Sequence, residues 1–152
     1  MKNRKARINQ STLKEDKDIV EFMTQLYIDS YLNAYKVIIT GGCNFEDYDY
    51  MSEKLNELFW CSDIFEEHSI KIISGTEKGT EMLAMRYADE HEMTKVLFPV
   101  NRKEYSQMAV MLRNRDMLTI ATHLVVFGDS ESDETGLIIE LAKEKGIPVW
   151  VF

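Results

Sequence analysis

The sequence has 152 residues, of which 45% are hydrophobic and 29% charged, and its net charge is −8. This length suffices for one domain with a full core and one appended element. No run approaches the ~18 apolar residues that span a bilayer, and no apolar stretch follows the charged N-terminus. We therefore expect a cytoplasmic protein with no membrane partner. Cys43 and Cys61 are too few for a disulfide framework, and no Cys or His pair has zinc-ligand spacing, so we expect free thiols, no metal and no cofactor.

The charge is unevenly distributed along the chain. Residues 1–7 carry four basic and no acidic side chains, whereas the remaining 145 residues carry 14 basic and 26 acidic ones. A body with that balance repels a nucleic acid backbone, so we expect no nucleic-acid partner. Residues 1–11 are predicted to be a flexible basic leader.

An amphipathic helix is predicted over residues 12–34. Thr12 and Glu15 form a capping-box pattern at its start. Apolar residues then recur at helical spacing, at Leu13, Ile19, Val20, Phe22, Met23, Leu26, Tyr27, Tyr31 and Leu32. This helix either packs across its own domain or pairs with another subunit, and the width of the apolar stripe makes a homo-oligomer plausible.

A strand that ends in two glycines follows the helix. Residues 37–39 are all β-branched, as in a strand buried on both faces of a parallel sheet. Gly41 and Gly42 stop the strand, and Asn44 and Asp47 can cap the helix that follows. A strand, a glycine turn and a helix form a layout that binds phosphate, because free N–H groups and the positive end of the helix dipole both favour an anion. The alternative is that the glycines only make a tight turn.

Strands and helices alternate over the rest of the chain. Strands are predicted at 37–39, 70–73, 96–98, 124–127 and 148–152. Helices are predicted over 48–59, 82–88, 103–121 and 135–145, the last ending at Gly146. The alternation predicts an α/β, Rossmann-like three-layer domain over residues 36–152 with a mostly parallel five-stranded sheet. The methionines at 82, 85, 108, 111 and 117 fall at helical spacing and are expected in the core.

Four motifs follow these elements in order. They are Gly41-Gly42-x-x-Phe45, Ser74-Gly75-x-x-x-Gly79, Arg113-Asn114-x-x-Met117 and Phe127-x-Asp129-x-x-Ser132-x-x-Thr135. In this order they resemble the YspA-like, cpYpsA-related branch of the SLOG superfamily over roughly residues 36–152. The resemblance implies a Rossmann-like fold that binds, often as a sensor, a nucleotide or nucleotide-derived ligand such as an ADP-ribose-type molecule. The ligand-binding residues it implies are Gly41, Gly42, Cys43, Phe45, Gly75, Lys78, Gly79, Glu81, Arg113, Asn114, Asp129, Ser132 and Thr135.

The chain departs from the family pattern within these motifs. Cys43 stands where the family usually has an arginine, and Lys78 and Glu81 stand where it has arginine and aspartate. Glu134 replaces a glycine and puts a negative charge where a phosphate would approach a helix N-terminus. We therefore expect a partly altered site. Arg113 and Asn114 are its best polar candidates, as a guanidinium fork and an amide for phosphate or ribose. Alternatively, Arg113 is a surface residue paired with Asp116 or a glutamate.

Two other functions stay open. The Lonely Guy-type phosphoribohydrolases, which act on nucleoside monophosphates, place a glutamate three residues after the motif threonine. Here Glu140 follows Thr135 by five residues, which turns it to another side of the helix. The third possibility is an oligomeric interaction scaffold that binds no ligand. The histidines at 68, 91 and 123 lie apart in sequence and are expected in surface or capping roles, so we assign no catalytic residue.

Overall fold

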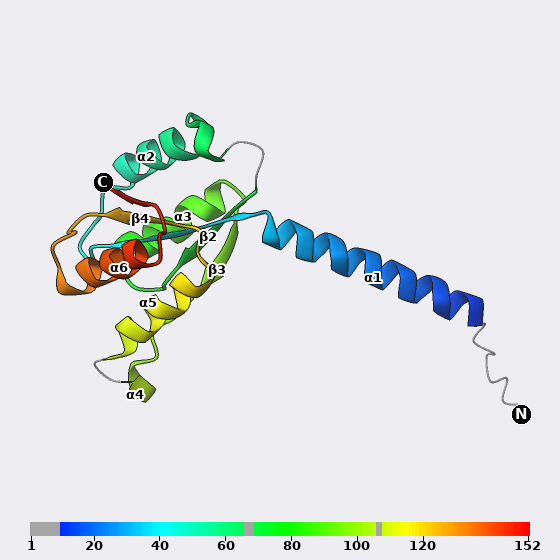
Figure 1. Cartoon of the computed structure of the whole chain (residues 1–152). Helices are drawn as coiled ribbons and strands as arrows, with labels where there is room; N and C mark the ends of the chain where they lie inside the picture. Colours follow the sequence, from blue (N-terminus) through cyan, green and yellow to red (C-terminus); the bar gives the residue numbers. More distant parts are fainter. Residues whose placement is uncertain (1–9, 66–68, 106–107) are drawn as a thin grey trace, which may run out of the picture. The chain divides into compact units, whose positions relative to one another are not determined.

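The computed structural model describes residues 10–65, 69–105 and 108–152. The chain divides into two compact units, residues 1–33 and residues 34–152. Helix α1 (Gln10–Leu32) makes up the described part of the first unit (Figure 1). It begins two residues before Thr12, so the predicted start was wrong by that margin. Residues 1–9 of the predicted leader lie outside the described residues.

Large apolar side chains of α1 are exposed along its length. They are Leu13, Ile19, Val20, Phe22, Met23, Leu26, Tyr27, Ile28 and Leu32. Polar contacts within the helix are local, such as the hydrogen bond from Gln25 Nε2 to Asp29 Oδ1 at 2.8 Å. The predicted amphipathic helix is thus present. No helix in the described ranges combines the length and the apolar character that crossing a bilayer requires.

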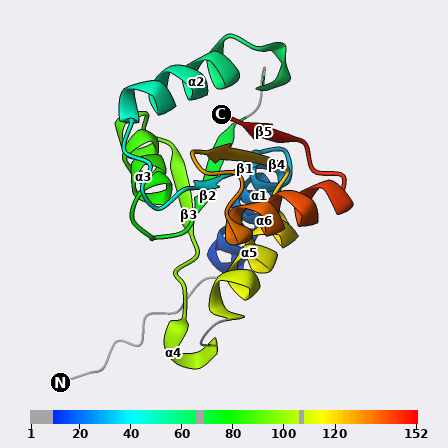
Figure 2. The same cartoon turned by 90° about the vertical axis from the view of Figure 1, so that its left-hand side faces the viewer.

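The second unit is a parallel sheet with helices on both faces, which confirms the predicted fold class (Figures 1 and 2). Its described strands are β1 (Tyr35–Gly41), β2 (Ile70–Ser74), β3 (Thr94–Leu97), β4 (His123–Phe127) and β5 (Val149–Val151). Their order across the sheet is β3-β2-β1-β4-β5. The helices are α2 (Tyr48–Trp60), the 3₁₀ turn η1 (Asp63–Phe65), α3 (Thr80–Glu90), α4 (Arg102–Tyr105), α5 (Ala109–Ile120) and α6 (Asp133–Glu144). The single helix predicted over 103–121 is therefore two helices, α4 and α5.

Each central strand is buried on both faces, which explains its continuous apolar sequence. Val37 and Ile39 of β1 pack in one core with residues of α2 and α3. Ile38, between them, packs in a second core with residues of α5 and α6. Side chains alternate between the two faces of a strand, so three consecutive β-branched residues supply both cores. Figure 2 shows the two helical layers on either side of the sheet.

Local capping signals place several helix ends. Asp47 caps α2 by accepting a hydrogen bond from the Tyr50 N–H at 2.9 Å, as predicted. His91 is the C-cap residue of α3, in agreement with its expected capping role. Gly146 follows the end of α6 with a φ of +71°, a left-handed conformation that glycine adopts readily.

Some predictions of burial were wrong. Among the methionines expected in the core, Met117 is fully buried, but Met82 and Met108 are 54% and 55% exposed. Helical spacing alone does not say which face of a helix meets the sheet, so it over-predicts burial. His123, expected at the surface, is only 9% exposed and stacks on Trp150 with ring centroids 5.6 Å apart. His68 lies outside the described residues.

The strand order places a crevice at the carboxyl edge of the sheet. The chain runs from β1 outward through β2 to β3, and then returns to β4 on the other side of β1. Gly41, at the end of β1, is in register with Phe127, at the end of β4. The loops after these two strands therefore leave in opposite directions. The crevice between two such loops is the usual position of a ligand in an open parallel sheet.

Candidate functional site

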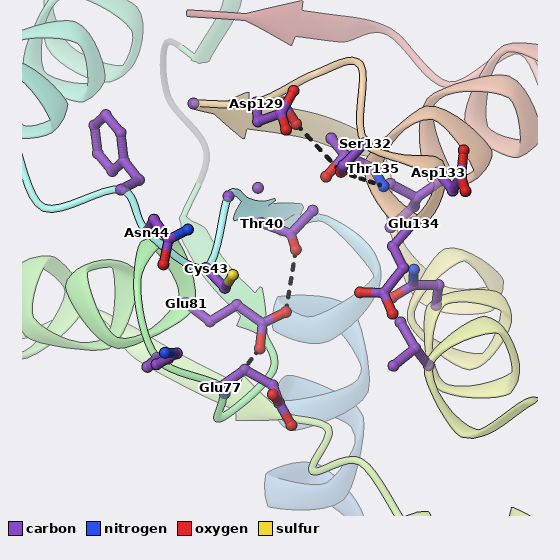
Figure 3. A pocket seen from close by; sticks show the side chains of 18 of the residues that line it. Thr40, Cys43, Asn44, Glu77, Glu81, Asp129, Ser132, Asp133, Glu134 and Thr135 are labelled. Atoms are coloured by element: carbon purple, nitrogen blue, oxygen red, sulfur yellow. Dashed lines mark hydrogen bonds between the residues drawn. The ribbon is translucent and has the colours of Figure 1, made fainter. Parts of the chain in front are cut away.

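A cavity of about 450 Å³ opens at this edge, between the loops that follow β1, β2 and β4 (Figure 3). All the predicted ligand-binding residues line it except Gly75 and Gly79. The sequence prediction missed other lining side chains, among them Thr40, Asn44, Glu77, Arg102 and Asp133. Thr40, Asn44 and Glu77 lie beside the motif glycines, so the motifs could have pointed to them. Arg102 lies 21 residues beyond Glu81 in sequence and carried no such signal.

Gly79 shapes the cavity without lining it. It has a φ of +83°, and a Cβ there would lie 2.5 Å from the Gly42 carbonyl oxygen. The next residue, Thr80, donates both its N–H and its hydroxyl to that same oxygen, each at 3.1 Å. Gly79 is thus the residue that lets the loop after β2 pack directly against the loop after β1.

Two N–H groups of the glycine turn form hydrogen bonds within the protein, whereas from the sequence we expected them to be free. The Gly42 N–H donates to the Phe127 carbonyl at 2.9 Å, and the Phe45 N–H donates to the Gly42 carbonyl at 3.2 Å. These two groups are therefore engaged within the protein and do not face an anion. The prediction of a cradle of free N–H groups is wrong for both positions.

A buried ion pair lies at the base of the cavity. Arg113 and Glu81 are 7% and 3% exposed, and Arg113 Nη1 lies 3.0 Å from each Glu81 carboxylate oxygen. Glu81 also accepts hydrogen bonds from the Thr40 hydroxyl at 3.1 Å and from the Glu77 N–H at 2.9 Å (Figure 3). Arg113 Nε donates to Asn114 Oδ1 at 3.1 Å. This bonding compensates both buried charges, as burial of a charge requires.

The ion pair changes what Arg113 can do. The guanidinium is held by Glu81, not by Asp116, so of the alternative pairings the glutamate is the one found. Gly75 makes room for the pair: a Cβ there would lie 1.9 Å from Arg113 Nη1 and 2.1 Å from Glu81 Oε2. Arg113 therefore lines the cavity as part of an ion pair that has no net charge. Gly75 supports the site by leaving space for this pair.

The turn between β4 and α6 forms another side of the cavity. Ser132 is the N-cap residue of α6, and its hydroxyl accepts the Thr135 N–H at 3.3 Å. Asp129 Oδ1 accepts the Glu131 N–H at 3.0 Å. Asp133 and Glu134 occupy the first turn of α6, and both are exposed. Two of the predicted ligand residues, Ser132 and Thr135, thus bond to each other in a helix cap.

The charges around the cavity are mostly acidic. Its described lining includes three basic and five acidic side chains. Arg113 pairs with Glu81, and Arg102 Nη2 lies 3.3 Å from Glu77 Oε2. Lys78 is exposed, and no carboxylate of a described residue pairs with it. Lys78 is therefore the lining cation that is available to a ligand.

Other side chains named in the sequence analysis have simpler environments. Cys43 and Cys61 are free thiols, and both are exposed. Glu140 is exposed and is not part of the cavity lining. Within the described ranges, no three His, Cys, Asp or Glu side chains come together in a group that could hold a metal ion.

The comparisons with known proteins give one match. Residues 35–105 match the sequence profile of the YspA, cpYpsA-related SLOG family. The matched segment runs from β1 to α4 and contains the motifs around Gly41 and Gly75, whereas Arg113, Asp129 and Thr135 lie beyond it. No curated protein and no solved structure matches the chain. Over residues 35–105, the chain is therefore similar to the YspA, cpYpsA-related SLOG family.

Proposed function

We propose that the cavity binds a nucleotide-derived ligand, and that ADP-ribose-type molecules are the class it accepts. The observation that carries this proposal is the convergence of predicted ligand residues from three separate loops on one cavity at the carboxyl edge of the sheet. A cavity of about 450 Å³ also falls within the usual range for small-molecule sites. The match of residues 35–105 to a SLOG family, whose proteins typically bind nucleotide-related ligands, supports the same proposal.

Three lining side chains can each contact a different part of such a ligand. Lys78 offers an ammonium group to a phosphate. Asp129 has a second carboxylate oxygen that can accept hydrogen bonds from ribose hydroxyls, since the Glu131 N–H is bonded to Oδ1. Phe45 is half-buried against Phe127, with ring centroids 5.6 Å apart, and offers an apolar surface to a base.

We propose binding without turnover, as in a ligand sensor. The cavity contains carboxylates, but Glu140, the carboxylate that follows the motif threonine, does not line it. The phosphoribohydrolase alternative therefore lacks support from the position of this residue. Analysis of the ligand after incubation with the protein separates the two functions, and we expect to recover ADP-ribose intact.

The test is titration calorimetry with ADP-ribose on the wild type and on Lys78→Gln. We expect the variant to bind about tenfold more weakly, because it loses a charge-assisted contact to phosphate. Since Lys78 is exposed, its loss leaves the fold intact. Arg113→Ala is a poorer probe, because it would leave Glu81 buried without its partner.

Lys143→Gln is the matched control, because Lys143 is exposed on α6 and is not part of the cavity lining. It removes the same charge from the protein and should bind ADP-ribose as the wild type does. An equal loss of affinity in both variants would show that only the overall charge matters. Absence of binding to the wild type would overturn the proposed function.

A further inference from the structure

We propose that the cavity selects nucleotide-derived ligands by the charge of their phosphates. It favours a pyrophosphate that ends in an ester, as in ADP-ribose, and disfavours a terminal phosphate monoester, as in ADP. This inference rests on the proposed function, and it deepens that function by naming the phosphate state of the ligand.

The first argument is the shortage of cations. Of the three basic side chains in the described lining, two are engaged by carboxylates, Arg113 by Glu81 at 3.0 Å and Arg102 by Glu77 at 3.3 Å. Arg113 and Glu81 are both nearly fully buried, so neither can turn to a ligand without leaving the other charge unpaired. Among the described lining residues, Lys78 is left to balance a negative charge on the ligand.

The second argument is the acidic turn on the other side of the cavity. The N-terminus of α6 is capped by the Ser132 hydroxyl, and Asp133 and Glu134 occupy its first turn. Two carboxylates there already take up the favourable interaction with the helix dipole. Figure 3 shows Glu134 on the side of the cavity opposite Glu81 and Cys43. A terminal phosphate bound in the cavity is therefore repelled by the carboxylates of Asp133 and Glu134.

The chemistry of the ligands converts this arrangement into selectivity. A phosphate diester carries one negative charge, whereas a terminal monoester carries about 1.5 to 2 at neutral pH. ADP therefore brings more negative charge than its β-methyl ester into the same cavity. The added charge is repelled by Asp133 and Glu134, and the two other cations of the described lining, Arg113 and Arg102, are already paired with carboxylates.

The experiment compares ADP with its β-methyl ester, which differ by one methyl group and the accompanying charge. Titration calorimetry on the wild type should show that the ester binds about tenfold more tightly. In the double variant Asp133→Asn/Glu134→Gln, the dissociation constants of ADP and its ester should lie within about twofold of each other. The affinity for ADP should rise more than the affinity for the ester. Both residues are exposed, so the variant should fold as the wild type does.

The control is Glu140→Gln/Glu144→Gln, which removes two exposed charges from α6 away from the cavity lining. It should keep the preference of the wild type for the ester. ADP-ribose, titrated in parallel, separates the two proposals. If ADP-ribose binds but ADP and its ester bind equally, or the double variant keeps the wild-type ratio, the charge selection is wrong and the proposed function stands. If ADP-ribose does not bind, both proposals fail.

Discussion

Gly75 shows how one residue supports the buried charges of the site. A Cβ at this position would lie 1.9 Å from Arg113 Nη1, and both ends of the ion pair are too buried to move into water. We therefore expect Gly75→Ala to displace the pair and to lower the free energy of unfolding by about 2–4 kcal/mol. Urea denaturation followed by circular dichroism measures the change.

Gly136→Ala is the control for this prediction. A Cβ at Gly136 would lie 4.0 Å from the Ser130 carbonyl oxygen, its nearest described neighbour, and the residue is within α6. Alanine is the better helix former, so this variant should gain about 0.5–1 kcal/mol. Similar stability changes in the two variants would mean that the ion pair does not depend on Gly75.

His123 predicts a pH dependence of stability. Its ring contacts the rings of Trp150 and Tyr35, with centroid distances of 5.6 and 5.1 Å, and burial lowers its pKa. The unfolded chain, with the ordinary His pKa of about 6.5, binds a proton first as the pH falls. The His123 contribution to stability is therefore present above pH 6.5 and is lost as the pH falls below it, by up to about 1.4 kcal/mol per pH unit.

The variant His123→Phe tests this assignment. Phenylalanine keeps an aromatic ring among the same neighbours but does not titrate. The free energy of unfolding of the variant should fall less steeply than that of the wild type between pH 6.5 and pH 5. Parallel curves for the two proteins would assign the pH dependence to the carboxylates of this acidic chain instead.

At the scale of elements, α1 presents large apolar side chains that are exposed along one face. Ile19, Met23 and Leu26 follow one another at helical spacing, and all three are exposed. The helix has 23 residues and is about 35 Å long, which is enough for several layers of side chains between paired helices. We propose that α1 pairs with α1 of a second copy of the chain.

The variant Ile19→Glu/Leu26→Glu places two charges on this face and should make the protein monomeric. Lys17→Glu, on the opposite side of the helix, should leave the assembly unchanged. Size-exclusion chromatography with light scattering gives the mass of each protein in solution. A wild type that is monomeric at high micromolar concentration would contradict the proposed pairing.

At the scale of the whole molecule, the strand order assembles the site. Thr40 and Glu81 are 41 residues apart in sequence, and Glu81 and Arg113 are 32 apart, yet their side chains are hydrogen-bonded. Thr40 and Glu81 meet because β1 lies beside β2, so that the loops after both strands open at one edge, and Arg113 reaches Glu81 from α5, which packs on β1. A different order of the same strands would separate these residues.

Local chemistry made much of this architecture predictable from the sequence. Val37, Ile38 and Ile39 predict a strand buried on both faces, because β-branched side chains fit a pleated surface and no polar residue interrupts them. Asp47 predicts a helix start because its carboxylate can reach the N–H groups of the first turn. These signals depend on neighbours along the chain, so the fold class followed from them, whereas the predicted site residues came from the resemblance of four motifs to a known family.

The sequence by itself thus determined the elements, their alternation and the loops that carry the candidate site. Only the tertiary structure decided that Arg113 is neutralised by Glu81, that Arg102 is engaged by Glu77 and that His123 is buried. The physical reason is that ion pairing and desolvation depend on distances between atoms in space. Residue patterns report spacing along the chain, and they do not contain those distances.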